Sequence, residues 1–124
     1  MTIQALLERC LAMPFAYADT PFGPEPICVR IGKRIFAEIY FTRAWVTLRC
    51  EPQQGLQWRA RFPDHVKRGY HCPPSQQPYA NTVVLDGAIP DEALLTMLEQ
   101  SYARVLRAMS RAERASVLSS VPEG

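Results

Sequence analysis

Apolar side chains recur along this chain at two spacings, one typical of helices and one typical of strands. Residues 3–13 carry an apolar side chain every three or four positions, with Thr2 placed to cap a helix and Pro14 placed to end it. The longest helical pattern covers residues 90–109. Its apolar stripe comprises Ala93, Leu94, Met97, Leu98, Tyr102, Val105, Leu106 and Met109. This stripe predicts the main helix of the core.

A weaker pattern predicts a helix in the middle of the chain. Pro52 suits the first position of a helix because its missing N–H group would have no partner there. The predicted helix covers residues 52–61, with Leu56 and either Trp58 or Ala60 facing inward.

The C-terminal part of the chain carries the signature of a capping box. Ser110 stands three residues before Glu113, a spacing at which each side chain bonds the backbone N–H group of the other residue. A short last helix is therefore predicted after Ser110, and residues 119–124 are expected to fray.

Three short runs rich in β-branched and aromatic residues predict strands. The runs are Ile27–Ile31, Arg34–Phe41 and Trp45–Cys50. The segments between them have two or three residues, too few for a parallel crossover, so the strands are expected to form an antiparallel meander. A fourth strand is predicted at Asn81–Asp86, and loops are predicted at 14–26 and 62–80.

The order of these elements defines a fold class. A helix, a three-stranded meander, a helix, a strand and two more helices are typical of a two-layer α+β domain, with the helices packed on one face of an antiparallel sheet. The chain has 124 residues, which is the usual size for a single core. One domain is therefore predicted over residues 1–124.

Alternation along the predicted strands assigns side chains to the two faces of the sheet. The side chains expected to face the helices are Ile27, Val29, Ile31, Ile35, Ala37, Ile39, Val46 and Leu48. Those expected to face outward are Arg30, Arg34, Tyr40, Trp45 and Arg49. In the second strand the assignment has an alternative, because Phe36 and Tyr40 compete with Ile35 and Ile39 for the core.

Charge is concentrated in one part of the chain. The net charge is +2, but the segment from Arg30 to Arg68 carries +6 and the remainder carries −4. A cationic sheet face with interleaved aromatic rings can contact phosphates and stack on bases. The candidate nucleic-acid contacts are Arg30, Lys33, Arg34, Arg49, Arg61, Lys67, Arg68 and His71, with Tyr40 and Trp45 as stacking residues. The alternative is a solvated sheet face, which the low net charge and the pI of about 8.4 favour.

Catalytic and metal-binding motifs do not stand out in the sequence. It contains no phosphate-binding glycine loop and no Gly-x-Ser-x-Gly element. The spacing of His65, His71, Cys50 and Cys72 matches no zinc pattern. We therefore expect a protein that is not an enzyme, with no catalytic residues, no metal and no cofactor.

The N-terminal residues lack the features of a signal peptide, because Glu8 and Arg9 interrupt the apolar stretch. No apolar run is long enough to span a membrane. These observations predict a cytoplasmic protein with no membrane partner, in which all four cysteines are free thiols.

Several short motifs occur together in a characteristic order. They are Pro21-Phe22-Gly23, Lys33–Ala37, Val46–Pro52, Gly69-Tyr70-His71, Asn81-Thr82-Val83, Asp86-Gly87, Pro90-Asp91 and Ser101-Tyr102. In this order they resemble the MmcQ/YjbR family of small bacterial proteins over residues 2–118. The resemblance implies a fold similar to that of the frataxin homologue CyaY, and it implies the DNA-binding role usually attached to the family.

Two features depart from what this resemblance implies. Residues 72–80 are rich in proline and longer than the corresponding family segment, and they lack its lysine and second histidine. Frataxin-like iron binding needs clustered carboxylates, whereas the first helix offers only Glu8.

Two functions of different classes therefore follow from the sequence. The first is weak or non-specific DNA binding through the basic sheet face. The alternative is a module that binds a protein partner or a small ligand through the loop at 69–79, without nucleic acid. A third, an uncharacterised enzyme, would have to use the loop at 62–80. Salt dependence separates the first two, because phosphate contacts weaken steeply with salt and an apolar interface does not.

Overall fold

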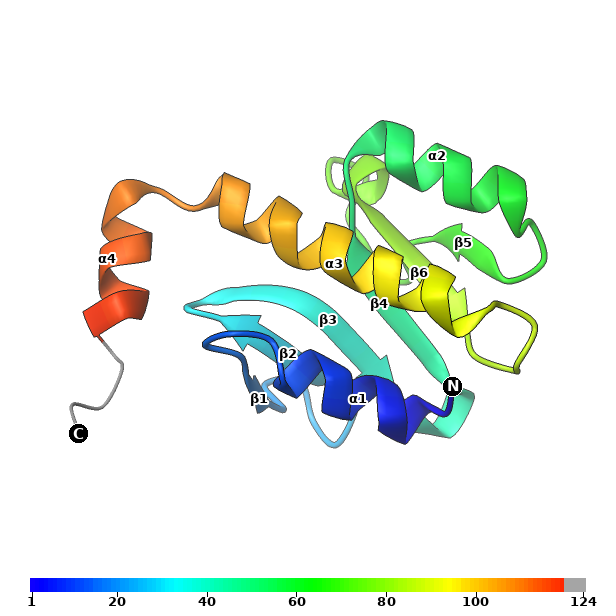
Figure 1. Ribbon diagram of the computed structural model, residues 1–124, viewed down its shortest axis with the longest axis horizontal. Coiled ribbons are helices and arrows are strands. Elements are labelled where there is room, and N and C mark those ends of the chain that lie inside the picture. The colour runs from blue at the N-terminus through cyan, green and yellow to red at the C-terminus, as the bar shows by residue number, and fades with distance from the viewer. Residues whose placement is uncertain (120–124) are drawn as a thin grey trace.

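A computed structural model describes residues 1–119 of the chain (Figure 1). The helices are α1 (Ile3–Leu11), α2 (Pro52–Arg61), α3 (Asp91–Ala108) and α4 (Arg111–Ser119). The strands are β1 (Tyr17–Asp19), β2 (Ile27–Ile31), β3 (Arg34–Tyr40), β4 (Trp45–Arg49), β5 (Val66–Arg68) and β6 (Ala80–Val84). Two single turns of 3-10 helix, η1 (Phe41–Arg43) and η2 (Gln77–Tyr79), complete the elements. Of the segment expected to fray, residues 120–124 lie outside the described residues.

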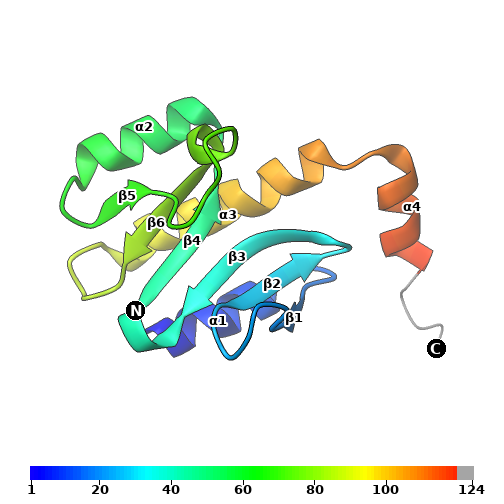
Figure 2. The same ribbon diagram turned by 180° about the vertical axis from the view of Figure 1, so that it is seen from behind.

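The strands form one antiparallel sheet in the order β1-β2-β3-β4-β6-β5. The helices pack on one face of this sheet, so the predicted α+β class is confirmed (Figures 1 and 2). The prediction of loops throughout 14–26 and 62–80 was wrong, because β1 and β5 lie there. Each has only three residues and adds to the edge of a longer strand, Ala18 opposite Val29 and Lys67 opposite Thr82. Strands this short leave no pattern of alternation in the sequence.

The helix ends follow the predicted capping chemistry. The Ala5 N–H group donates to Thr2 Oγ1 at 3.1 Å, and the Glu113 N–H group donates to Ser110 Oγ at 3.1 Å. In α2 the predicted inward position of Leu56 was wrong, because this side chain is 59% exposed. The helix packs instead through Gly55 and Trp58. None of the helices among residues 1–119 is long and apolar enough to cross a lipid bilayer.

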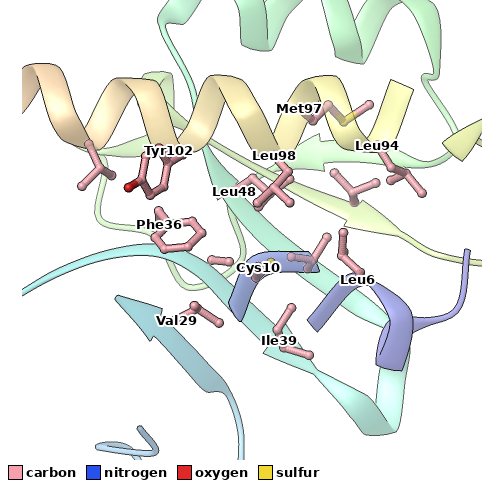
Figure 3. Packing of buried hydrophobic residues seen from close by; sticks show 14 of the residues in the cluster. Leu6, Cys10, Val29, Phe36, Ile39, Leu48, Leu94, Met97, Leu98 and Tyr102 are labelled. Atoms are coloured by element: carbon pink, nitrogen blue, oxygen red, sulfur yellow. The ribbon is translucent and has the colours of Figure 1, made fainter. Parts of the chain in front are cut away.

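The core lies between the sheet and the helices α1 and α3 (Figure 3). The stripe along α3 is buried as predicted, apart from Leu106, which is partly buried. Leu98, which is 2% exposed, belongs to the same cluster as Leu48 of β4 and Leu6 of α1. The sequence pattern therefore located the main core helix correctly.

A β-bulge in β3 changes which side chains face the helices. Val29 lies opposite Ala37, but the next residue, Arg30, lies opposite Ile35, so Phe36 is the additional residue on β3. Phe36 is fully buried, and its ring meets the Tyr102 ring edge to face at 5.4 Å. A bulge of one residue reverses the alternation of the strand on one side of it.

Two predicted orientations are wrong for this reason. Ile35 lies opposite Arg30 and therefore turns away from the helices. Arg34 lies opposite the buried Ile31 on the helix side, where its guanidinium group pairs with Glu113 of α4 through bonds of 2.7 and 3.0 Å. Arg34 thus does not belong to the predicted basic face.

A serine of α3 separates β3 from β4 just beyond the bulge. Extending the pairing of Ala37 with Leu48 by one step would place Phe36 opposite Arg49. At that point the Arg49 N–H group donates to Ser101 Oγ at 2.7 Å, and the Ser101 hydroxyl donates to the Phe36 carbonyl oxygen. The pairing of β3 with β4 ends here. The first residues of β3 therefore border an opening in the sheet.

Candidate ligand groove on the outer sheet face

The face of the sheet away from the helices, here called the outer face, is covered in its middle by the chain itself. The hydroxyl groups of Thr47 and Thr82 bond each other at 2.7 Å, and both residues are buried. The Tyr70 N–H group donates to Thr82 Oγ1 at 2.8 Å. The Tyr70 ring packs edge to face against the rings of Tyr40 and Trp45, with centroids 5.7 and 5.3 Å apart. Figure 2 shows the segment after β5 running across the sheet on this side.

Two cavities lie on either side of this covering segment. The first, here called the wide cavity, has a volume of about 730 Å³. The residues that line this cavity alone are Phe22, Pro24, Glu25, Pro26, Tyr40, Thr42 and Arg43. The narrow cavity, of about 360 Å³, extends past the start of β3 to α3 and has Lys33, Arg34, Tyr79 and Arg104 among its walls. Both cavities share Ile35, Glu38, Arg49, Tyr70 and His71. We call the two together the outer groove.

The shared wall is held by a chain of polar contacts. The Arg49 guanidinium group donates to Glu38 Oε1 at 2.8 Å, and the Tyr40 hydroxyl donates to Glu38 Oε2 at 3.5 Å. The side chains of Glu38 and Arg49 are 15% and 24% exposed, so the pair is largely shielded from solvent. Burial, together with the charge of Glu38, raises the pKa of Tyr40 to about 12. Tyr40 is therefore a neutral hydrogen-bond donor at physiological pH.

The rim of the wide cavity is formed by the segment before β2 and by η1. Glu25 accepts hydrogen bonds from the Thr42 hydroxyl at 2.7 Å and from the Thr42 N–H group at 3.3 Å. These contacts fix the segment against η1. Phe22 stands on this rim with 69% of its surface exposed. The Arg43 guanidinium group lies over the Trp45 ring, 4.9 Å from its centroid.

The predicted outward orientation is confirmed for Arg30, Arg49, Tyr40 and Trp45, but these residues are engaged within the protein. Arg30 pairs with Asp19 at 2.9 Å and also donates to the Lys33 carbonyl oxygen. Arg49 pairs with Glu38, and both aromatic rings pack against Tyr70. The arginines of the predicted basic face are therefore neutralised by carboxylates beside them.

Three other predicted contacts lie at a different edge of the sheet. Arg61 ends α2 and lies over the rings of Trp58 and Phe62, 5.6 and 4.9 Å from their centroids. Lys67 and Arg68 belong to the edge strand β5 and are exposed. The structure therefore divides the predicted nucleic-acid residues. Lys33, Arg34, Arg49 and His71 line the outer groove, whereas Arg61, Lys67 and Arg68 form a separate group, here called the β5 edge.

The sequence analysis named Tyr70 only as part of the loop at 69–79, and it did not offer Phe22, Ile35, Glu38 or Arg104 as site residues. Glu38 could have been found, because it stands two positions before Tyr40 along the strand and therefore shares its outward face. Ile35 depends on the bulge. The positions of Phe22 and Tyr70 depend on where two irregular segments pack, one against η1 and one over Thr82, for which the sequence carries no local signal.

The other His, Cys, Asp and Glu side chains of the described residues do not group into a metal centre. Among residues 1–119, no three His, Cys, Asp or Glu side chains are grouped so that they could hold a metal ion. The four cysteines are free, and burial raises the pKa of the Cys72 thiol at the edge of the groove, which disfavours its nucleophilic thiolate form. His65 and Asp86 form a pair at 2.8 Å that lies outside both cavities.

Comparisons with known proteins agree on one family. A family model described as YjbR matches residues 11–104. The chain is 25% identical to the uncharacterized protein YjbR of Escherichia coli strain K12 over 116 residues, which is 92% of this chain and 95% of that protein.

Solved structures give the same result for the fold. The Deinococcus radiodurans protein DR2400, with the family-model domain DUF419, is 28% identical and superposes with a TM-score of 0.82, covering 94% of this chain and 87% of that one. A Pseudomonas syringae protein at 15% identity superposes with a TM-score of 0.66 over 82% of this chain and 96% of its own, which supports the fold alone.

Proposed function

The chain belongs to the YjbR family, and we propose that it is a non-catalytic binding module that takes a small ligand in the outer groove. The observation that supports this proposal best is the wall of five residues common to both cavities. One molecule can therefore contact both cavities at once. Their volumes fall within the range of about 300–1,000 Å³ that is common for small-ligand sites. A cytoplasmic setting belongs to the same proposal, in keeping with free thiols.

The walls of the groove are fixed by contacts that need no ligand. Tyr70 is held through its backbone by Thr82 and through its ring by Tyr40 and Trp45. Glu38 is held by Arg49. A preformed wall lowers the entropy cost of binding, because few side chains have to be ordered by the ligand.

A screen of small molecules by NMR, with the backbone amides of the full chain assigned, tests this function. We expect binders to shift the amides of Ile35, Glu38, Tyr70 and His71. The double variant Glu38→Gln/Arg49→Gln should weaken these binders, and it leaves no unpaired charge behind. The matched control is Asp19→Asn/Arg30→Gln, which removes a similar ion pair that lines neither cavity. The proposal would be contradicted if the binders shifted only amides outside the groove. It would also be contradicted if they bound the Glu38→Gln/Arg49→Gln variant as tightly as the wild type.

Nucleic-acid binding is a second candidate, and the β5 edge is the observation that favours it. Within the described part of the chain, no carboxylate lies at ion-pair distance from Arg61, Lys67 or Arg68. Unpaired cations on an exposed edge suit the phosphate backbone, which is recognised without regard to sequence. This location replaces the central sheet face as the site to test.

Charge reversal at this edge tests the second candidate. If the edge binds phosphates, Lys67→Glu/Arg68→Glu should weaken binding of a random DNA duplex and reduce the slope of log K against log salt by about two. The control Arg111→Glu/Arg114→Glu places the same charge change on α4 and should have little effect. Absence of duplex binding by the wild type at low salt would exclude this function.

A further inference from the structure

We infer that the ligand of the outer groove is a small aromatic anion, with its planar ring in the wide cavity and its phosphate or carboxylate group in the narrow cavity. This inference rests on the proposed function and adds the chemical class and the orientation of the ligand. It is drawn from the different charge and composition of the two cavities.

The narrow cavity is cationic. Its walls contain Lys33, Arg34, Arg49 and Arg104, against the single carboxylate of Glu38. Arg34 and Arg104 do have acidic partners, Glu113 and Glu51, but neither partner lines the cavity. Since a cavity with walls of low dielectric focuses the field of the charges that line it, this one favours an anion.

Several of these cations have hydrogen-bond donors to spare. Lys33 is exposed, and among residues 1–119 no carboxylate lies at ion-pair distance from it. Within the described part of the chain, the Arg49 guanidinium group donates one side-chain hydrogen bond, to Glu38, although it has five N–H donors. Arg104 is positioned over the Tyr79 ring, 4.5 Å from its centroid. An anion in this cavity can therefore be bound without breaking the Glu38–Arg49 pair.

The wide cavity is aromatic and less charged. Its walls include the rings of Phe22, Tyr40 and Tyr70, together with Pro24 and Pro26. Its two acidic side chains, Glu25 and Glu38, are already bonded to Thr42 and Arg49. A planar ring would cover the exposed face of Phe22 and remove it from water.

The arrangement of the cavities determines the orientation of the ligand in the groove. Arg49 and His71 line both cavities and so stand at their junction. A molecule with its anionic group beside Lys33 and Arg49 can extend its ring past Tyr70 toward Phe22. Lys33, Arg34 and Arg104 line only the narrow cavity, and the exposed Phe22 ring lines only the wide cavity. We therefore expect this one orientation.

Titrations of the full chain with matched probes test the inference. Adenosine 5′-monophosphate carries both parts, adenosine carries only the ring system, and ribose 5-phosphate carries only the anion. Indole-3-acetate and indole distinguish a carboxylate from a phosphate in the same way. At least one complete probe should bind about tenfold more tightly than either of its halves, since each part adds its own contacts. The anionic half should shift the amides of Lys33 and Arg104, and the ring should shift those of Phe22 and Arg43.

Two surface variants assign the parts of the ligand to the cavities. Lys33→Gln should weaken the complete probe about three- to tenfold and leave the ring-only probe unchanged. Phe22→Ala should weaken both the complete probe and the ring-only probe. The matched controls are Lys67→Gln, which removes a cation outside the groove, and Leu118→Ala, which removes an apolar side chain that is 63% exposed. Neither control should change the affinity of any probe.

The outcomes separate this inference from the function on which it rests. Neutral binders in the groove, with no gain from an attached anion, would overturn the inference and leave the proposed function standing. If neither the probes nor the screen shifts groove amides, the proposed function itself fails. Binding of an oligonucleotide at the groove without binding of any mononucleotide would also overturn the inference.

Discussion

The two faces of this sheet are closed by different physical means. On the helix face, apolar side chains such as Val29, Val46 and Val83 are covered by helices whose own apolar stripes match them. On the outer face, Thr47 and Thr82 are just as inaccessible, but hydrogen bonds to each other and to the Tyr70 backbone satisfy them. The first closure depends on area removed from water, and the second on the pairing of polar groups.

This difference also explains why the outer groove lies on the face away from the helices. A helix covers the sheet continuously, because its side chains interdigitate along its length. The irregular segment over the outer face covers only the centre, around Tyr70, and leaves a cavity on each side. The face with the less complete cover is therefore the one available to a ligand.

The largest effect is expected on the helix face. Leu98→Ala should lower the free energy of unfolding by about 2–5 kcal/mol, because the residue is 2% exposed and its loss leaves a cavity. Urea titration followed by circular dichroism measures this change. The control is Leu56→Ala in α2, where the side chain is 59% exposed, and its effect should stay within about 0.5 kcal/mol. Equal effects of the two variants would mean that the helix face does not provide the main stabilisation.

A smaller effect is expected at the centre of the outer face. Thr82→Val keeps the shape of the side chain but removes the hydroxyl that bonds Thr47 and the Tyr70 N–H group. Leaving these buried groups unpaired should cost about 1–3 kcal/mol. Hydrogen exchange at the Tyr70 amide should become faster, since the covering segment loses its anchor.

Thr96→Val is the matched control for this change. The Thr96 hydroxyl donates to the Glu92 carbonyl oxygen on the exposed side of α3, where water can replace it. Its stability effect should be well below that of Thr82→Val, and the exchange of the Tyr70 amide should not change. If Thr82→Val left the exchange of this amide unaltered, the hydrogen bond would not be what holds the segment down.

The same contrast explains how much of the fold was predictable. The helices and the three central strands follow from local periodicity and capping, so Thr2, Pro52 and Ser110 located helix ends correctly. The bulge in β3 was not predictable, because Phe36 enters the core to meet Tyr102, a residue 66 positions further along the chain. Periodicity alone cannot show where a strand gains a residue.

The candidate site was predictable only in part. Alternation correctly turned Tyr40 and Arg49 outward, because Tyr40 lies in the regular part of β3 and Arg49 lies in β4, which has no bulge and pairs in register with β6. The same reasoning treated the outer face as open to solvent. The position of Tyr70 over Thr82 depends on a contact between an irregular loop and a strand, and the pairing of arginines with Asp19 and Glu38 depends on strand order. These contacts convert an expected basic surface into a groove.

The smallest expected effect concerns the ion pair between Glu113 and Arg34, the arginine that the bulge turns toward the helix face. The bonds from Arg34, and then the backbone bond from Ser110, lower the pKa of Glu113 to about 2 from its usual value of 4.5. A carboxyl group whose pKa is lowered by folding stabilises the protein above its unfolded pKa, and this contribution is lost as the pH falls through the folded pKa. The pair should therefore stabilise the docking of α4 fully above about pH 4.5 and lose this effect progressively down to about pH 2.

Glu113→Gln isolates this contribution. At pH 7 the variant should show faster amide exchange in α4 than the wild type, and the difference should shrink as the pH falls from about 4.5 to about 2, where the wild-type carboxyl group becomes protonated. Because both side chains are partly exposed, salt should also reduce the difference. Glu99→Gln, an exposed carboxylate on α3, is the control and should not affect α4. A difference in exchange that stays constant from pH 7 to pH 2 would show that the charge of Glu113 does not hold α4 against the hairpin of β2 and β3.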